Sequence, residues 1–278
     1  MATIDAHLHL WDLGHGTYSW LSDAVAPINR TFAFAEVEPQ LAAAGVDRVV
    51  LVQAADTADD TAAMLAVAAA QPRVAGVVGW IDLLQPDAVA GALDRSAAEG
   101  PLVGIRHLIH DEADPDWLTQ DAVHRSLAVL ASRGLAFDVI GVLPRHLEHA
   151  LALADEQPDL RLVVDHLGTP PVGSEPGEWA RLIDELGRRP NVFVKLSGLT
   201  TLGPSGRATA AELSPYVDRA LAAFGPSRML YGGDWPVSTL AAPYDDTIAV
   251  ARDLVAALTP AERDDVFGGA AARAYRLP

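Results

Sequence analysis

The stretch TIDAHLHLWD at residues 3–12 decides between two fold classes. It reads as a short β-strand that carries three polar residues at alternate positions, Asp5, His7 and His9. A doubly wound open sheet would carry a G-x-G-x-x-G fingerprint directly after its first strand, and this stretch has none. Because residues i and i+2 of a strand point to the same side, His7 and His9 are predicted to point together, with Asp5 on the same face.

Seven further apolar runs follow, at 48–53, 74–82, 102–108, 135–141, 161–168, 192–198 and 228–235. Near-continuous apolar runs of this kind are typical of parallel strands buried on both faces. Amphipathic segments that suit helices lie at 36–45, 57–71, 86–100, 120–134, 144–157, 204–225 and 243–258. Strand and helix alternating in this way predict an α/β fold, a single-domain (β/α)8 TIM barrel over residues 1–278. The connection 11–35, which carries Trp11, Tyr18 and Trp20, is expected to form a structured loop over the barrel mouth.

The composition excludes several classes of function. The formal net charge is −17, from 37 acidic and 20 basic residues, and no run of Lys or Arg is present. This balance argues against nucleic acid or an anionic membrane as a partner. The chain has no cysteine, which excludes disulfides, thiolate metal sites and a cysteine nucleophile. Neither a signal peptide nor an apolar stretch of membrane-spanning length is visible, so a soluble cytoplasmic protein is expected.

Polar residues gather at the carboxyl ends of the predicted strands, where TIM barrels carry their chemistry. Besides the first strand, these positions hold Gln53, Trp80, Arg106, His107, Asp138, Asp165, His166, Lys195, Ser197, Asp234 and Trp235. Two imidazoles on one face can chelate a divalent metal ion or donate hydrogen bonds to one substrate oxygen. An isolated His-x-His pair is as often structural, but His166 and Asp234 at two other strand ends favour a functional site.

Other polar residues are expected to be structural. His124, His146 and His149 fall inside predicted helices and are expected at the surface. His15 and His110 lie on loops beside strand ends, where solvation is favoured over the alternative of lining a pocket. Asp165 should point away from His166 by alternation and serve the structure. No G-x-S-x-G nucleophile motif is present.

The motifs IDAHLHLWD, GIRHLIHDEADPDWL, RLVVDHLGTP, FVKLSGL and YGGDWP occur in this order along nearly the whole chain. In these the chain resembles the amidohydrolase superfamily, in its branch of sugar-lactone hydrolases of the L-fuconolactonase, L-rhamnonolactonase and 2-pyrone-4,6-dicarboxylate lactonase type. The resemblance implies a metal or hydrogen-bonding site of His7, His9, His166 and Asp234. It implies one divalent ion, zinc or manganese, or a metal-independent site, and no organic cofactor. Metal-dependent members of the superfamily also use a histidine or a modified lysine from the fourth or fifth strand as a ligand. This chain has Asp138 at the end of its fifth predicted strand, which departs from that ligand pattern.

The resemblance further implies that water opens a cyclic ester. Catalysis is assigned to Asp234 as general base, to His166 and to Arg106, a fixed cation for the substrate carbonyl. The residues expected to line the sugar pocket are Gln53, Trp80, His107, Asp138, Lys195 and Trp235. The expected partner is a small-molecule sugar lactone, and the expected state is a monomer or homodimer. A metal-dependent decarboxylase or hydratase, a lactone isomerase and a non-catalytic sugar-binding barrel remain alternatives.

Overall fold

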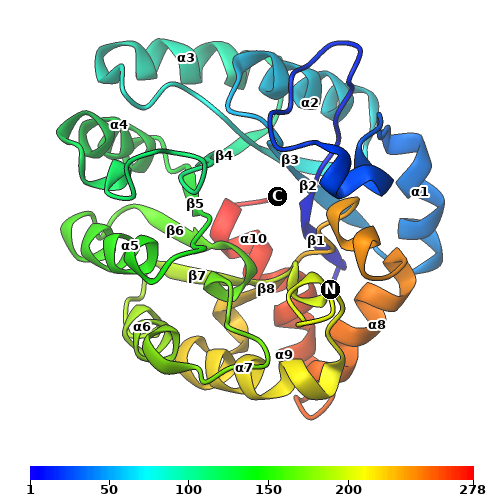
Figure 1. The fold of residues 1–278 in the computed structure, drawn as a ribbon. Helices are drawn as coiled ribbons and strands as arrows, with labels where there is room; N and C mark the ends of the chain where they lie inside the picture. The colour runs from blue at the N-terminus through cyan, green and yellow to red at the C-terminus, as the bar shows by residue number, and fades with distance from the viewer.

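The computed structural model describes all 278 residues. Its centre is an eight-stranded parallel sheet in which each strand pairs with the next along the chain. The strands are β1 (Ile4–Leu8), β2 (Arg48–Val52), β3 (Val74–Gly79), β4 (Leu102–His107), β5 (Ala136–Val139), β6 (Arg161–Val164), β7 (Val192–Leu196) and β8 (Met229–Tyr231). All eight predicted strands are present, so the predicted TIM barrel is confirmed (Figure 1).

Beyond its last strand the chain returns to the first strand and joins the two ends of the sheet. The amide of Asp234 donates to the carbonyl of His7, and the amide of His9 donates to the carbonyl of Trp235, both at 2.7 Å. The seam between the last and first strands therefore runs directly beside the paired histidines.

Helices surround the barrel, and the last of them covers its centre in the view of Figure 1. They are α1 (Phe34–Ala43), α2 (Ala58–Ala70), α3 (Pro86–Glu99), α4 (Asp121–Ser132), α5 (Pro144–Glu156), α6 (Gly177–Gly187), α7 (Ala210–Phe224), α8 (Tyr244–Leu254), α9 (Pro260–Asp264) and α10 (Ala270–Tyr275). The sequence prediction did not include α9 and α10, and it missed α6 as well. Its buried Trp179, Leu182, Ile183 and Leu186 recur at helical spacing, which is the signal that identifies it.

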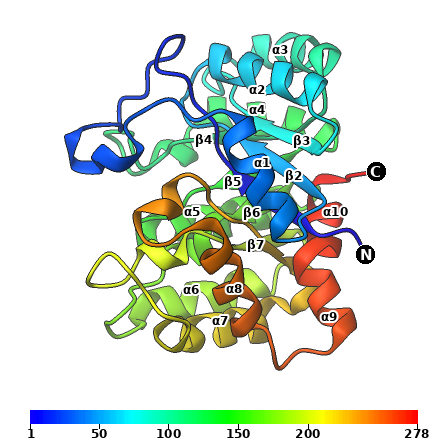
Figure 2. The ribbon, with the colours of Figure 1, turned by 90° about the vertical axis from the view of Figure 1, so that its right-hand side faces the viewer.

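The inside of the barrel is packed with small and branched apolar residues. Ile4, Ala6, Val50, Val52, Val78, Ala136, Val163, Phe193 and Leu230 form one buried cluster with Ala270, Ala271, Ala274 and Tyr275 of α10. Helix α10 therefore closes one end of the barrel. Figure 2 shows α10 and both chain termini at that end, and the long first loop at the opposite end.

The first loop is ordered by its aromatic residues. Trp11 pairs with Phe32 in an isolated antiparallel bridge, and its indole nitrogen donates to the carbonyl of Arg30 at 2.6 Å. Tyr18 is buried and donates its hydroxyl to Asp60 on α2 at 3.0 Å. The predicted structured loop is thus present. No helix has the length and apolar character needed to cross a membrane.

Candidate active site

Three side chains converge at the seam of the barrel. The Nε2 atoms of His7 and His9 lie 3.0 Å apart, and Oδ1 of Asp234 lies 3.6 Å from the first and 3.4 Å from the second. All three residues are buried, with at most 5% of their surface exposed. Nδ1 of His9 lies 2.8 Å from the carbonyl of Val52, which fixes that nitrogen as a donor and leaves Nε2 with a lone pair.

A β-bulge aims His7 into the barrel. The pairing of β1 with β2 shifts between Asp5 and Leu8, and a bulge of this kind re-aims a side chain next to an active site. Asp5 therefore does not share the face of His7 and His9, which corrects the expectation from simple alternation. Its carboxylate accepts from the amide of Gly233 and from the hydroxyl of Tyr244, both at 2.8 Å, so it stabilises the seam.

A left-handed turn delivers His166. β6 ends at Val164, and His166, Leu167, Gly168 and Thr169 all have positive φ angles of 52–67°. Such conformations cost energy outside glycine and concentrate at functional sites. The His166 ring lies 4.7 Å from the His7 ring, and its Nδ1 is 2.9 Å from the hydroxyl of Ser197. Gly198 lies against this ring: a Cβ there would be 2.5 Å from Nδ1 of His166.

The same turn overturns the expectation for Asp165. Its carboxylate does not point away from the site, because the turn brings His166 to the side that Asp165 already faces. Oδ2 accepts from Arg106 at 2.9 Å, and Oδ1 lies 2.9 Å from Nζ of Lys195 and 3.4 Å from Nδ1 of His7. Burial would raise the pKa of Asp165, but Lys195, His7 and Arg106 together hold it well below its ordinary value.

Arg106 lies at the floor of the site. Beyond its contact with Asp165, one guanidinium nitrogen donates to the carbonyl of Gln53 at 2.5 Å, and Nε is buried with no partner. The Gln53 side chain does not reach the site: its amide donates to Asp56 at 2.7 Å and contacts the carbonyl of Arg106. Arg106 is therefore held rigidly and keeps one N–H unpaired.

Asp138 and Lys195 lie below the histidines. Both are fully buried, and they form an ion pair of 2.6 Å. Lys195 also contacts Nδ1 of His7 at 2.9 Å. Burial raises the pKa of Asp138 to about 6, despite the ammonium beside it. The two residues were predicted to line the sugar pocket, but they are not among the residues that line it.

A pocket of about 180 Å³ opens above this cluster. Its lining combines four of the predicted residues with one aromatic residue of the first loop, one further histidine and apolar side chains: His9, Arg106, His166, Asp234, Trp20, His110, Ala54, Leu108, Ile140 and Val237. Trp20 and His110 were not predicted as site residues. The sequence signal for Trp20 was an aromatic residue on a loop expected over the mouth, and the signal for His110 was its place directly after a strand end.

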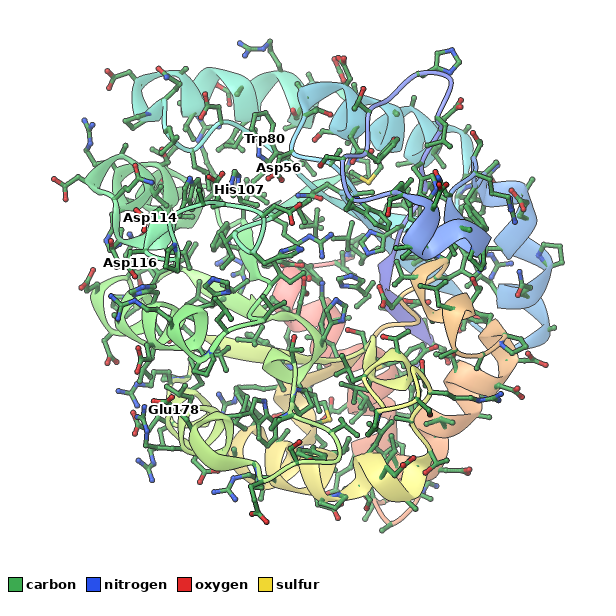
Figure 3. The ribbon with its side chains drawn as sticks, viewed as in Figure 1. Asp56, Trp80, His107, Asp114, Asp116 and Glu178 are labelled. Atoms are coloured by element: carbon green, nitrogen blue, oxygen red, sulfur yellow. The ribbon has the colours of Figure 1, made fainter.

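Three other predicted pocket residues lie outside the pocket lining. The Trp80 indole donates to Nδ1 of His107 at 3.0 Å, and the His107 ring stacks on Trp117 at 3.9 Å. Figure 3 places Trp80, His107 and Asp56 together on the α2 and α3 side of the barrel. Trp235 is 2% exposed and packs edge-on against Phe32. These residues support the loops around the mouth.

The remaining histidines differ in how far they are exposed to solvent. His15 is largely exposed, as expected, and His124 and His149 are partly exposed. His146 is only 2% exposed, so its predicted surface position is wrong. It lies in the first turn of α5 and faces inward with Leu147. Helical periodicity alone did not show this, because charged neighbours flank it in sequence.

A larger pocket of about 340 Å³ lies between the first loop and α2, lined mainly by apolar residues such as Leu10, Trp11, Phe34 and Met64. It contains none of His7, His9 and Asp234. The pocket of about 180 Å³ therefore holds the candidate active site.

The donor set at the seam suits a divalent ion. Zinc ligands at about 2.1 Å in tetrahedral geometry lie roughly 3.4 Å apart, close to the separations among His7, His9 and Asp234. Burial lowers the pKa of His7 well below its ordinary value, and it also lowers the pKa of His166, so both rings are neutral, as ligands must be. His166 belongs to a second group with His7 and Asp165. There Lys195 and Arg106 already balance the carboxylate, so the first group fits a cation better.

A family model described as Amidohydrolase matches residues 4–277. The chain belongs to the amidohydrolase family. This membership confirms the resemblance inferred from the motifs.

Amidohydrolase relatives match this chain along its full length. L-Fucono-1,5-lactonase of Burkholderia ambifaria is 39% identical over 280 residues, covering 99% of this chain and 95% of that protein. L-Fucono-1,5-lactonase of Burkholderia multivorans is 34% identical, covering 99% and 96%. A crystal structure of an amidohydrolase from Burkholderia multivorans with bound zinc superposes with a TM-score of 0.92 at 33% identity, covering 100% of both chains.

Proposed function

We propose that this protein is a lactonase that hydrolyses a sugar 1,5-lactone to the open aldonic acid. The observation that carries the proposal is a carboxylate, three imidazoles and a guanidinium lining one pocket of about 180 Å³. Ester hydrolysis needs a base for the attacking water and positive charge for the developing oxyanion, and this set supplies both. The two full-length relatives named L-fucono-1,5-lactonase support the same chemistry.

Asp234 is the proposed general base. It lines the pocket, and a left-handed backbone conformation at φ 53° holds it there. Its amide is bonded to the carbonyl of His7, so its position is tied to the seam. In the proposed reaction, water attacks the lactone carbonyl carbon and gives a proton to Asp234. The ring C–O bond then breaks, and that proton passes to the leaving ring oxygen.

Arg106 is the proposed partner of the carbonyl oxygen. A guanidinium keeps its charge throughout the reaction. Its contacts with Asp165 and Gln53 hold it in place before substrate arrives, and it is one of the residues that line the pocket. A donor fixed in advance stabilises developing charge without reorganisation. His166, which also lines the pocket, is the proposed second donor to substrate oxygens.

We propose that His7, His9 and Asp234 hold one divalent ion, and that this ion is zinc. Two imidazoles and a carboxylate form a zinc-type ligand set. When bound, such an ion supplies Lewis acidity toward water and carbonyl oxygens. The relative crystallised with zinc supports this choice.

The sugar is proposed to lie between Trp20 and the wall formed by Leu108, Ile140 and Val237, with His110 facing its hydroxyls. An aromatic face and a few polar groups are what a polyol ring requires. Gln53, Trp80, His107, Asp138, Lys195 and Trp235 are proposed to act on the substrate only through the residues they support.

A panel of L-fucono-, L-galactono-, L-rhamnono- and arabinono-lactones tests the proposal, each followed with a pH indicator against an enzyme-free blank. Acid release above the blank supports a lactonase. Release of carbon dioxide from a carboxylated substrate would indicate a decarboxylase, and a new lactone without acid would indicate an isomerase. If no lactone releases acid faster than the blank, even with added zinc, the proposal fails.

A further inference from the structure

Helix α10 does more than close the barrel. Tyr275 of this helix is 2% exposed, and its hydroxyl donates to Oδ2 of Asp138 at 2.7 Å. Burial, together with the neighbouring Asp138 carboxylate, raises the pKa of Tyr275 well above its ordinary value. The hydroxyl therefore keeps its proton and remains a donor. The last residue of the last helix thus reaches a charged side chain inside the barrel.

Asp138 depends on few contacts. Oδ2 receives the Tyr275 hydroxyl and the Lys195 ammonium, while Oδ1 is buried without a partner. A buried carboxylate with only two donors on one oxygen is oriented by those donors. Loss of the tyrosine hydroxyl leaves Lys195 as the only hydrogen-bond partner of Asp138.

Lys195 connects Asp138 to the active site. Its Nζ lies 2.6 Å from Asp138, 2.9 Å from Oδ1 of Asp165 and 2.9 Å from Nδ1 of His7. An ammonium has three donors and no acceptor, so Nδ1 of His7 is the acceptor in this contact. Nε2 of His7 then carries the ring proton, and a metal ion that binds there would have to displace it. The other ring nitrogen of His7 faces His9 and Asp234. The position of the ammonium thus sets the orientation of the His7 ring.

We propose that Tyr275, Asp138 and Lys195 are positioning residues, a buried hydrogen-bond chain through which the C-terminal helix fixes the His7 ring in the active site. The chain begins at the closed end of the barrel and ends at the seam. None of its members lines the pocket, so they act through His7 and do not touch the substrate.

Tyr275→Phe tests this chain because it removes one oxygen and keeps the ring. Tyr216→Phe is the matched control. Tyr216, on α7, is 7% exposed, and its hydroxyl lies 2.8 Å from the carbonyl of Pro171, outside the barrel. The two readouts are the ¹⁵N NMR signals of the His7 ring, assigned with a His7→Gln variant, and kcat and KM on the best lactone of the panel.

We expect Tyr275→Phe to shift the His7 ring signals and to lower kcat about tenfold, the low end for loss of a residue that orients a site ligand, with KM within about twofold. Tyr216→Phe should change neither, whatever its melting temperature. Unchanged His7 signals or unchanged kcat in Tyr275→Phe overturns the proposal. If that variant does not fold, Asp138→Asn replaces it with the same expectations. The kinetic readout rests on the proposed function, but the NMR readout does not. If the wild type is inactive on lactones, the NMR signals therefore still test the hydrogen-bond chain.

Discussion

Gly198 offers a sharp test of how the site is built, through the variant Gly198→Ala. The residue has φ 65°, where an L side chain costs about 1–2 kcal/mol. Its new Cβ would lie 2.5 Å from Nδ1 of His166, so the ring must move. That movement breaks the 2.9 Å contact with Ser197, worth about 1 kcal/mol. The total is about 2–3 kcal/mol, which predicts a melting temperature lower by about 4–12 °C.

Activity distinguishes the clash from simple backbone strain. Displacement of His166 should lower kcat at least tenfold, since a shift of about 1 Å in a group of the active site can lower the rate a hundredfold. Gly45→Ala is the control: it has φ 70° with nothing within 4 Å of the new Cβ, so it should lose stability and keep its kcat. Thermal unfolding and lactone kinetics on both variants decide. If Gly198→Ala matches Gly45→Ala in melting temperature and in kcat, the reasoning is refuted.

Three further predictions follow from the site. Arg106→Lys keeps the charge but loses the planar fork, so kcat/KM should fall about 10- to 100-fold in the lactone assay; an unchanged value contradicts its role. Zinc at a hundredfold excess over its Kd should stabilise the wild type by about 2.7 kcal/mol and leave His9→Ala unaffected, measured by thermal unfolding with and without zinc; equal stabilisation of both contradicts the ligand set. The pKa of Asp138 is about 6 in the folded protein, against an ordinary value of 3.8. Between these two pH values the folded protein keeps a proton on Asp138 that the unfolded chain has released. The contribution of Asp138 to the free energy of unfolding therefore falls as pH rises. The free energy of unfolding of Asp138→Asn relative to wild type should therefore increase by about 2 kcal/mol from pH 4 to pH 6.5, measured with urea; a constant difference contradicts the shift.

The barrel could be predicted because its strands are nearly pure apolar runs and its helices carry clear periodicity. Those patterns depend only on which faces are buried, which a sequence displays directly. The pairing of His7 with His9 follows from the same logic. The meeting of His7 with Asp234 required the fold, since only closure of the barrel places the eighth strand beside the first.

The errors have local backbone causes. Alternation predicted Asp5 beside His7 and Asp165 away from His166, and both predictions failed where the strand geometry breaks. A bulge in β1 and a left-handed turn after β6 reverse the expected sides. Neither feature has a strong sequence signature here, because Leu167 and Thr169 are not residues that favour positive φ.

Residues at strand ends proved to fall into two groups that sequence could not separate. Arg106, His166 and Asp234 reach the pocket, whereas Asp138 and Lys195 are fully buried and do not line it. The depth of a side chain along the barrel axis depends on the stagger of the strands, which cannot be read directly from a sequence. The contact of Asp138 with Tyr275, 137 positions away, could come only from the position of α10.

The most direct test of the central claim compares wild type with Asp234→Asn on L-fucono-1,5-lactone, by acid release above the enzyme-free blank. Asparagine keeps the shape of the side chain, but it cannot accept the proton of water and it lacks the carboxylate proposed as a zinc ligand, so kcat should fall about 100- to 10,000-fold while the melting temperature changes little. Wild-type turnover in Asp234→Asn, or no acid release by the wild type, would contradict the account.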